Sequence, residues 1–121
     1  MIVDDHVDTR EALAIVLELR GLAAIVAGSG SEALAKLAEP AERPCVVLLD
    51  VNMPGLDGWE VRQRMREDPE LASVPVVLLT GNYVDLERAR RLGIRGCLRK
   101  PVDVHQIVDA VERHCEWRAA G

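Results

Sequence analysis

The stretch from Cys45 to Gly58, CVVLLDVNMPGLDG, decides the fold of this 121-residue chain. It begins with an unbroken apolar run, Cys45 to Leu49, of the kind that forms a strand buried on both faces of a parallel sheet. The run ends at Asp50, and the Pro, Gly and Asp residues that follow are typical of turns. Because open parallel sheets bind ligands beyond the carboxyl ends of their strands, the pattern predicts a carboxylate at a binding site.

The rest of the chain alternates between apolar segments of strand length and amphipathic segments of helix length. Further strands are predicted at 1–3, 22–26, 76–79 and 96–98. Helices are predicted after the N-caps Asp8, Ser31 and Asp103, from Trp59 onward, and from Asp85 to Leu92. The last helix is expected to bury one face made of Val104, Ile107, Val108, Val111 and Cys115. Five βα units with right-handed crossovers predict a doubly wound α/β fold with helices on both faces of the sheet.

Length and composition predict a single globular domain that spans residues 1–121. A chain of this length is one domain by the usual prior, and 49% hydrophobic with 29% charged residues is ordinary for a soluble protein. Aromatic residues make up only 2% of the chain. The core is therefore expected to consist of Val, Leu, Ile and Ala.

The charge distribution argues against nucleic acid and membrane partners. The net charge is -5, and no run of Lys or Arg offers a basic patch to a phosphate backbone or a lipid surface. The apolar runs are far shorter than the roughly 20 residues of a membrane span, and no signal-peptide pattern is present. We therefore expect a cytoplasmic protein with no direct contact to nucleic acid or membrane.

The three cysteines are expected to be free and buried. Cys45, Cys97 and Cys115 lack CxxC spacing and fall within apolar patterns. In a cytoplasmic protein this arrangement favours buried thiols over a disulfide or a zinc site.

Polar groups follow four of the five predicted strands and should meet at one edge of the sheet: Asp4 with Asp5, then Asp50, Thr80 and Lys100. Two carboxylates 4 Å apart repel by about 4 kcal/mol at an effective dielectric of about 20, so the acids need compensating charge. Lys100 and a divalent cation would supply it. Mg²⁺ suits an all-oxygen site, whereas Zn²⁺ prefers His or Cys. The histidines are expected to be exposed and to form no ligand set: His6, His105 and His114.

This set of groups predicts chemistry on phosphorus. A carboxylate can act as the nucleophile while a cation and a Lys neutralise the charge on the transferred oxygens. Asp50 is the best candidate for the nucleophile, Asp4 and Asp5 for the metal platform, and Thr80 for a hydroxyl donor to the phosphoryl group.

Four motifs in order then identify a family. The acid pair Asp4-Asp5, the pattern LLDVNMPGLDG around Asp50, Leu79-Thr80-Gly81 and Lys100-Pro101 together resemble the receiver domain of two-component response regulators over essentially the whole chain. The resemblance implies a flavodoxin-like sheet of five parallel strands in the order 2-1-3-4-5. It also implies a regulatory phosphoacceptor that catalyses only its own phosphorylation and dephosphorylation.

The resemblance assigns a role to each site residue. Asp50 would accept a phosphoryl group from a sensor histidine kinase or a histidine phosphotransfer protein. Mg²⁺ would be bound by Asp5, Asp50 and the backbone carbonyl of Asn52, with Asp4 assisting through water. Thr80 and Lys100 would hold the phosphoryl group, and the peptide bond between Lys100 and Pro101 would be cis.

The same resemblance predicts a switch, with one departure from the family. Phosphorylation should draw Thr80 and Lys100 inward and repack the surface of the fourth helix, fifth strand and fifth helix. Many receivers carry an aromatic ring where this chain has Cys97, so no ring can turn there, and Tyr83 is the candidate substitute. Whether that surface meets an output domain or a homodimer partner is left open.

Three other functions fit the sequence less well. A small Mg²⁺-dependent phosphohydrolase with Asp50 as nucleophile would need a second acid where this chain has Asn52. A degenerate receiver that binds partners without phosphorylation would not need Asp50, Thr80 and Lys100. A dinucleotide site at 28–33 matches GxGxxA, but it would belong to an edge strand and leave the acidic rim unexplained.

Overall fold

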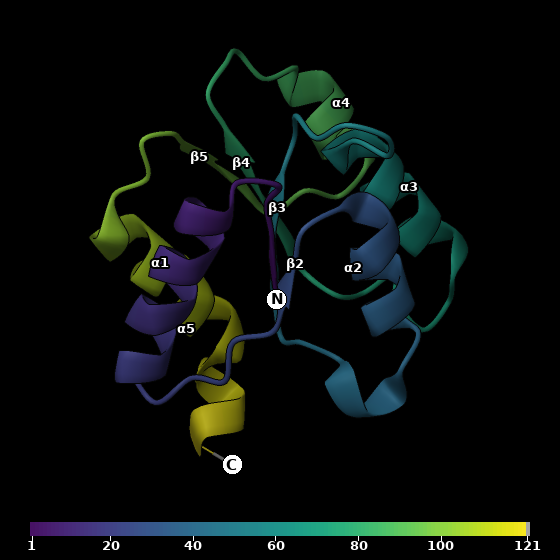
Figure 1. Ribbon diagram of the computed structural model, residues 1–121. Coiled ribbons are helices and arrows are strands. Elements are labelled where there is room, and N and C mark those ends of the chain that lie inside the picture. Colours follow the sequence, from purple (N-terminus) through teal and green to yellow (C-terminus); the bar gives the residue numbers. More distant parts are fainter. Residues whose placement is uncertain (121) are drawn as a thin grey trace.

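Five parallel strands alternate with five α-helices in the computed structural model, which describes residues 1–120 (Figure 1). The strands are β1 (Ile2–Val3), β2 (Val26–Ala27), β3 (Val47–Asp50), β4 (Val76–Thr80) and β5 (Gly96–Arg99). The helices are α1 (Val7–Leu19), α2 (Gly30–Leu37), α3 (Gly58–Glu67), α4 (Leu86–Arg91) and α5 (Val104–Ala120), with a short 3₁₀ helix, η1, at Pro40–Glu42.

The strand order is β2-β1-β3-β4-β5, and every neighbouring pair is parallel. This confirms the doubly wound fold and the predicted order. Because β3 lies at the centre, its last residue, Asp50, has the ends of β1 and β4 on either side. The order therefore brings polar residues from distant parts of the sequence to one edge of the sheet.

Both faces of the sheet are buried, as the continuous apolar run of β3 predicts. Val47 and Leu49 pack with residues of α2 and α3, whereas Val46 and Leu48 pack with residues of α1 and α5. Side chains that alternate between two buried faces must all be apolar. Figure 1 shows the same division, with α1 and α5 on one side of the sheet and α2 and α3 on the other.

Two predicted helix starts are wrong. Helix α1 begins one residue before Asp8, with His6 at the N-cap and no side-chain cap. Helix α2 is capped by Ser29 rather than Ser31, because Ser29 Oγ accepts a hydrogen bond from Glu32 N while Glu32 Oε2 accepts one from Gly28 N. A Glu three residues after a Ser is the usual signal for such a cap, and in this chain it points to Ser29.

The second strand is also shorter and later than predicted. It pairs with β1 only, through Val26 and Ala27, since β1 itself offers just two residues for pairing. Leu22 and Ala24, placed in the strand from sequence, pack instead against the core on the α1 and α5 side.

The predicted apolar face of α5 is confirmed except at its first turn. Ile107, Val108, Val111 and Cys115 are buried, but Val104 is 44% exposed. Asp103 supports the helix start as expected, because its Oδ1 accepts a hydrogen bond from His105 N at 2.7 Å.

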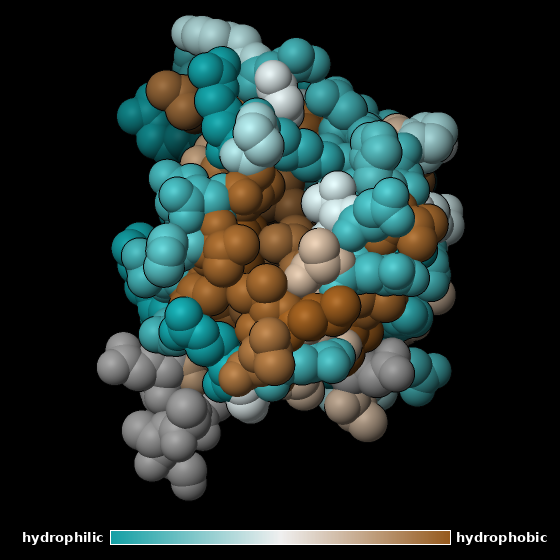
Figure 2. All heavy atoms as spheres, turned by 60° about the vertical axis from the view of Figure 1, so that its left-hand side comes forward, coloured by the Kyte–Doolittle hydropathy of each residue, from teal (hydrophilic) through white to brown (hydrophobic). Residues whose placement is uncertain are grey.

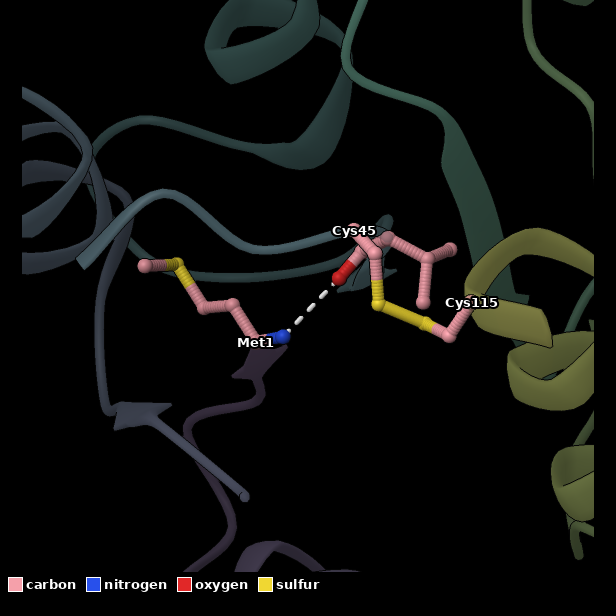
Figure 3. The surroundings of a disulfide bond; sticks show 4 residues. Met1, Cys45 and Cys115 are labelled. Carbon is pink, nitrogen blue, oxygen red and sulfur yellow. Dashed lines mark hydrogen bonds between the residues drawn. A yellow bond between two sulfur atoms is a disulfide. The ribbon is translucent and has the colours of Figure 1, made fainter. Parts of the chain in front are cut away.

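The prediction of free, buried cysteines is wrong for Cys45 and Cys115, which are not free, and only partly right for Cys97. Cys45, just before β3, and Cys115, on α5, form a disulfide with Cα atoms 5.4 Å apart (Figure 3). Cys97 is free but exposed. The two bonded residues lie 70 positions apart in the sequence, so their proximity depends on the packing of α5 against the sheet, which spacing motifs do not report.

Among the described residues, no helix has both the length and the apolar character needed to cross a membrane.

Two leucines at helix ends test this description of the core. Leu37 is completely buried at the end of α2, and Leu19 is 80% exposed at the end of α1. Leu37→Ala should lower the free energy of unfolding by about 2–5 kcal/mol through lost burial and the cavity left behind. Leu19→Ala should change it by no more than about 0.5 kcal/mol. Urea unfolding followed by circular dichroism measures both, and equal losses would contradict the assignment.

Candidate functional site

Two buried carboxylates lie side by side at the carboxyl edge of the sheet. Asp50 is the last residue of β3, and Asp4 directly follows β1, whose Val3 is in register with Leu49. Asp4 is completely buried and Asp50 is 2% exposed. Burial of two acids together is costly unless other groups compensate their charge.

Lys100 provides that compensation. Its Nζ lies 2.9 Å from Asp4 Oδ2 and donates a 3.0 Å hydrogen bond to Asp50 Oδ2. Lys100 follows β5, and its peptide bond to Pro101 is cis, as the family resemblance implies. One ammonium group therefore bridges two acids that come from different strands.

Backbone amides hold the other carboxylate oxygens. His6 N donates to Asp4 Oδ1 at 2.9 Å, and Asn52 N donates to Asp50 Oδ1 at 3.1 Å. Each acid thus receives one main-chain hydrogen bond from the residue two positions later. These bonds fix the orientation of both carboxylates.

The acidic cluster has unused ligand capacity. Asp4, Asp5, His6 and Asp50 each offer one ligand atom, and these atoms lie within 4.8 Å of one another. Asp4 Oδ2 and Asp5 Oδ1 are buried and accept no hydrogen bond; their contacts are ion pairs with Lys100 and with the His6 ring. Buried carboxylate oxygens without hydrogen bonds fit the oxygen-rich environment that a hard divalent cation needs.

His6 is exposed, as predicted, but its ring lies within the group of side chains that could hold a cation. Its Nδ1 lies 3.2 Å from Asp4 Oδ1 and 3.3 Å from Asp5 Oδ1, although the side chain is 69% exposed. His6 directly follows Asp4 and Asp5 in the sequence, and this adjacency could have predicted the contact. Asn52 reaches the cluster through its backbone N–H, and its side chain lies at the exposed surface.

The pKa values of the three central groups separate their roles. Burial raises the pKa of Asp50 above its ordinary value of 3.8, and hydrogen bonds from Lys100 and Asn52 offset only part of this effect. Burial acts in the same direction on Asp4, but the His6 N–H and Lys100 outweigh it, so the pKa of Asp4 is lowered. Burial lowers the pKa of Lys100, yet the two carboxylates outweigh it and raise that pKa above 10.5. Lys100 therefore stays charged.

The turn at 28–33 does not form a dinucleotide pocket. It follows β2, which is at the edge of the sheet. A Cβ at Gly28 would meet the Arg10 guanidinium at 2.9 Å, and one at Gly30 would meet Val61 at 2.7 Å. Side chains of the protein therefore pack directly against both glycines.

Comparison with known proteins decides the family. The family model of the response regulator receiver domain matches residues 1–112. The chain belongs to this receiver domain family. The receiver is 37% identical over 117 residues to an uncharacterized 14.6 kDa protein of Leptolyngbya boryana, with 95% of this chain and 88% of that protein covered. It is 33% identical over 114 residues to sporulation initiation phosphotransferase F of Bacillus subtilis, with 94% and 90% covered.

Solved structures agree with this assignment. The chemotaxis protein CheY4 of Vibrio cholerae matches the receiver with a TM-score of 0.85 at 28% identity, covering 93% of this chain and 94% of that chain. The receiver therefore acts in two-component signalling, where such domains have a regulatory role and work with histidine kinases or phosphotransfer proteins in general. The phosphohydrolase alternative gains no support from these relatives.

Thr80 lies on the same edge of the receiver but does not join the ion cluster. Its hydroxyl donates to Asn82 O and accepts from Asn82 N, both at 3.1 Å. A cavity of about 380 Å³ beside it is lined by Cys97 and Tyr83 among others, and Tyr83 is 90% exposed. Among the residues whose side chains the structure describes, Tyr83 is the aromatic residue that lines this cavity, and none is buried in it.

Close packing between α3 and β3 fixes the main chain of the Asp50 loop. Gly58 N donates to Val51 O at 3.0 Å, and the preceding residue, Asp57, forms a capping box with Glu60. A Cβ at Gly58 would lie 2.5 Å from Asp50 O and 2.9 Å from Val51 Cα. Only glycine fits at this position.

Gly58→Ala should therefore destabilise the receiver by about 1–3 kcal/mol or more, since the atoms that would clash with the new methyl group belong to the backbone. Gly81, at the end of β4, is a matched control because a Cβ there meets nothing within 4 Å. Gly81→Ala should be close to neutral. Urea unfolding of both variants distinguishes them, and a tolerated Gly58→Ala would show that the loop is less constrained than described.

Asp50→Asn should raise the free energy of unfolding when no divalent cation is present. Because the pKa of Asp50 is raised in the folded state, the folded protein binds a proton at this carboxylate more tightly than the unfolded chain does. The free energy of unfolding therefore falls as the pH rises from 3.8 through the raised pKa of Asp50. Above that pKa, no further stability is lost through this group. Asn removes that unfavourable charge. Unfolding titrations in EDTA should show a gain that grows from acidic to neutral pH.

Asp57→Asn is the control for this experiment. Its side chain caps α3 by accepting from Glu60 N, and Asn caps helices about as well as Asp. The variant should match the wild type within about 0.5 kcal/mol at neutral pH. A loss of stability in Asp50→Asn would mean that its pairing with Lys100 outweighs the cost of burial.

Proposed function

We propose that residues 1–121 form one receiver domain that accepts a phosphoryl group on Asp50 in a Mg²⁺-dependent reaction. The observation that carries the proposal is the buried strand-end carboxylate of Asp50, with Lys100 Nζ at 3.0 Å and two buried acid oxygens beside it that lack hydrogen bonds. This arrangement has a nucleophile, a fixed cation and room for a second cation. It lacks the second acid that a phosphohydrolase of this type would need at Asn52.

Asp50 is the nucleophile of the proposed transfer. One of its carboxylate oxygens attacks the phosphorus of a phosphohistidine, so that an O–P bond forms while the P–N bond breaks and the donor imidazole keeps the electron pair. Lys100 then pairs with the phosphoryl oxygens in place of the Asp50 carboxylate. Thr80 donates its hydroxyl to a phosphoryl oxygen after releasing Asn82.

Asp4, Asp5, Asp50 and the Asn52 backbone carbonyl are proposed to hold Mg²⁺, with Asp4 acting through water. Bound Mg²⁺ would supply neutralisation of the charge on the transferred oxygens. His6 supplies a nitrogen ligand, which suits Mg²⁺ poorly. We assign it instead to orienting Asp4 and Asp5 through the contacts at 3.2 and 3.3 Å.

The phosphorylated state is proposed to signal through the face made by α4, β5 and α5. A phosphoryl group adds nearly two negative charges and strong acceptors at Asp50. Thr80 ends β4 and Lys100 follows β5, so movement of both side chains toward that charge alters the strands next to α4 and α5. With Cys97 in place of a ring, the cavity beside Thr80 is available to Tyr83. An output domain or a second copy could read this face.

The receiver is proposed to be cytoplasmic, and its phosphodonor to be a sensor histidine kinase or a histidine phosphotransfer protein. The donor's phosphohistidine must reach Asp50, so its docking face must border the acidic cluster, from which α1 begins. Figure 2 shows hydrophobic side chains gathered on the face of the molecule that carries α1. Val7, Ile15 and Leu19 are exposed on that helix and lie within about a third of its circumference. This stripe is proposed to contact the donor.

Intact mass measurement after incubation with a small acyl phosphate and Mg²⁺ tests the proposed function. The wild type should gain the mass of one phosphoryl group, and EDTA should abolish the gain. Asp50→Asn should gain nothing, whereas Asp57→Asn, a change on the same loop, should behave as the wild type. An adduct that persists in Asp50→Asn would refute the acceptor assignment, and one that persists in EDTA would refute the metal requirement.

A further inference from the structure

The Cys45–Cys115 disulfide lies at the opposite end of the sheet from Asp50. Cys45 precedes β3, whose last residue is Asp50, and Cys115 comes from the C-terminal half of α5 (Figure 3). Cys115 is 3% exposed, whereas Cys45 is only partly buried. The bond therefore ties the entry of the central strand to the last helix, far from the acidic cluster.

A hollow of about 380 Å³ lies against this bond. Both cysteines line it, and most of the other lining residues are apolar ones from the end of α1, the approach to β2 and η1. Arg43 also lines it, with its guanidinium paired to Glu70 at 2.8 Å. A small molecule that enters the hollow is therefore next to both cysteines.

We propose that Cys45–Cys115 is a reversible redox modification site that exchanges with a small thiol such as glutathione through this hollow. Disulfides in cytosolic proteins are usually transient or redox-sensing, because the compartment keeps thiols reduced. The inference takes the cytoplasmic location from the proposed function. It does not depend on phosphorylation of Asp50.

The exchange proceeds in two balanced steps. A thiolate attacks Sγ of Cys45, the less buried of the two residues. A mixed disulfide forms at Cys45 while the bond to Cys115 breaks, and Cys115 leaves as a thiolate that takes up a proton. A second thiol attacks the outer sulfur of the mixed disulfide and releases Cys45. Two small thiols become one small disulfide, and their two electrons reduce the protein bond.

The consequence is a change in how firmly α5 is held. Ile107 and Val111 pack the helix onto the sheet through apolar contacts, and the disulfide adds a covalent tie near its C-terminal end. The reduced receiver keeps the apolar contacts and loses the tie. Because α5 belongs to the proposed signalling face, the redox state would set how easily that face rearranges.

Thiol counting across a series of glutathione to glutathione disulfide ratios tests the proposal. The purified full chain is equilibrated without denaturant, quenched with acid, unfolded and alkylated, and its intact mass gives the number of thiols. The count should change reversibly from one, at Cys97, to three. Three free thiols at every ratio would show that the Cys45–Cys115 bond does not form. One free thiol in excess glutathione would show that the bond is not accessible to a small thiol. Either result overturns the proposal.

Matched variants assign the change and separate it from phosphorylation. Cys97→Ser should keep the two-thiol transition, and Cys45→Ala should abolish it. Asp50→Asn should also keep it, so loss of phosphorylation and loss of the redox transition can be told apart. The reduced wild type should melt on the order of 10 °C below the oxidised form. Equal melting temperatures of the reduced and oxidised forms would contradict the claim that the disulfide stabilises the packing of α5.

Discussion

The pairing of one Lys100 ammonium with two buried carboxylates is the interaction on which the carboxyl edge of this receiver depends. Asp4 and Asp50 could not both remain ionised at that depth without a cation in contact with them. Lys100 reaches both acids at about 3 Å only because β1 and β3 are neighbours and β5 ends at the same edge of the sheet. The strand order therefore places Lys100 where the charges of Asp4 and Asp50 need it.

The compensation is incomplete, and this gives the site its capacity to react. Asp50 keeps a raised pKa despite the Lys100 hydrogen bond, while Asp4 Oδ2 and Asp5 Oδ1 accept no hydrogen bond. An electrostatic site that is already built but short of positive charge favours binding of a further cation. Lys100 can then pair with a phosphoryl group in place of one carboxylate, without a change in the strands that position it.

Sequence patterns predicted the buried parallel strands and the polar residues at their carboxyl ends. The apolar runs before Asp50 and Thr80 identified buried parallel strands, and parallel strands must bring Asp4, Asp50 and Lys100 to one edge. The patterns failed where three-dimensional packing decides. The Cys45–Cys115 bond depends on the position of α5, and the turn of the Thr80 hydroxyl toward Asn82 depends on one loop. The cap at Ser29 and the contacts of His6 were readable locally, from Glu32 and from the adjacent acids.

Helix α5 connects the two ends of the sheet. It begins shortly after Lys100 at the acidic edge, and Cys115 fastens it at the other edge. Cys97 lines the cavity beside Thr80, and the aromatic side chain that lines it with Cys97 is the exposed Tyr83. We infer that two features control the face made by α4, β5 and α5. One is the position of Lys100, and the other is whether the Cys45–Cys115 disulfide holds α5.

The most direct test of the central claim is to locate the acceptor residue. The receiver is phosphorylated with an acyl phosphate and Mg²⁺, reduced with borohydride to convert an aspartyl phosphate to homoserine, and digested for peptide sequencing by mass spectrometry. The account predicts homoserine at position 50 alone. Homoserine at Asp4, Asp5 or Asp57, with Asp50 unmodified, would contradict it.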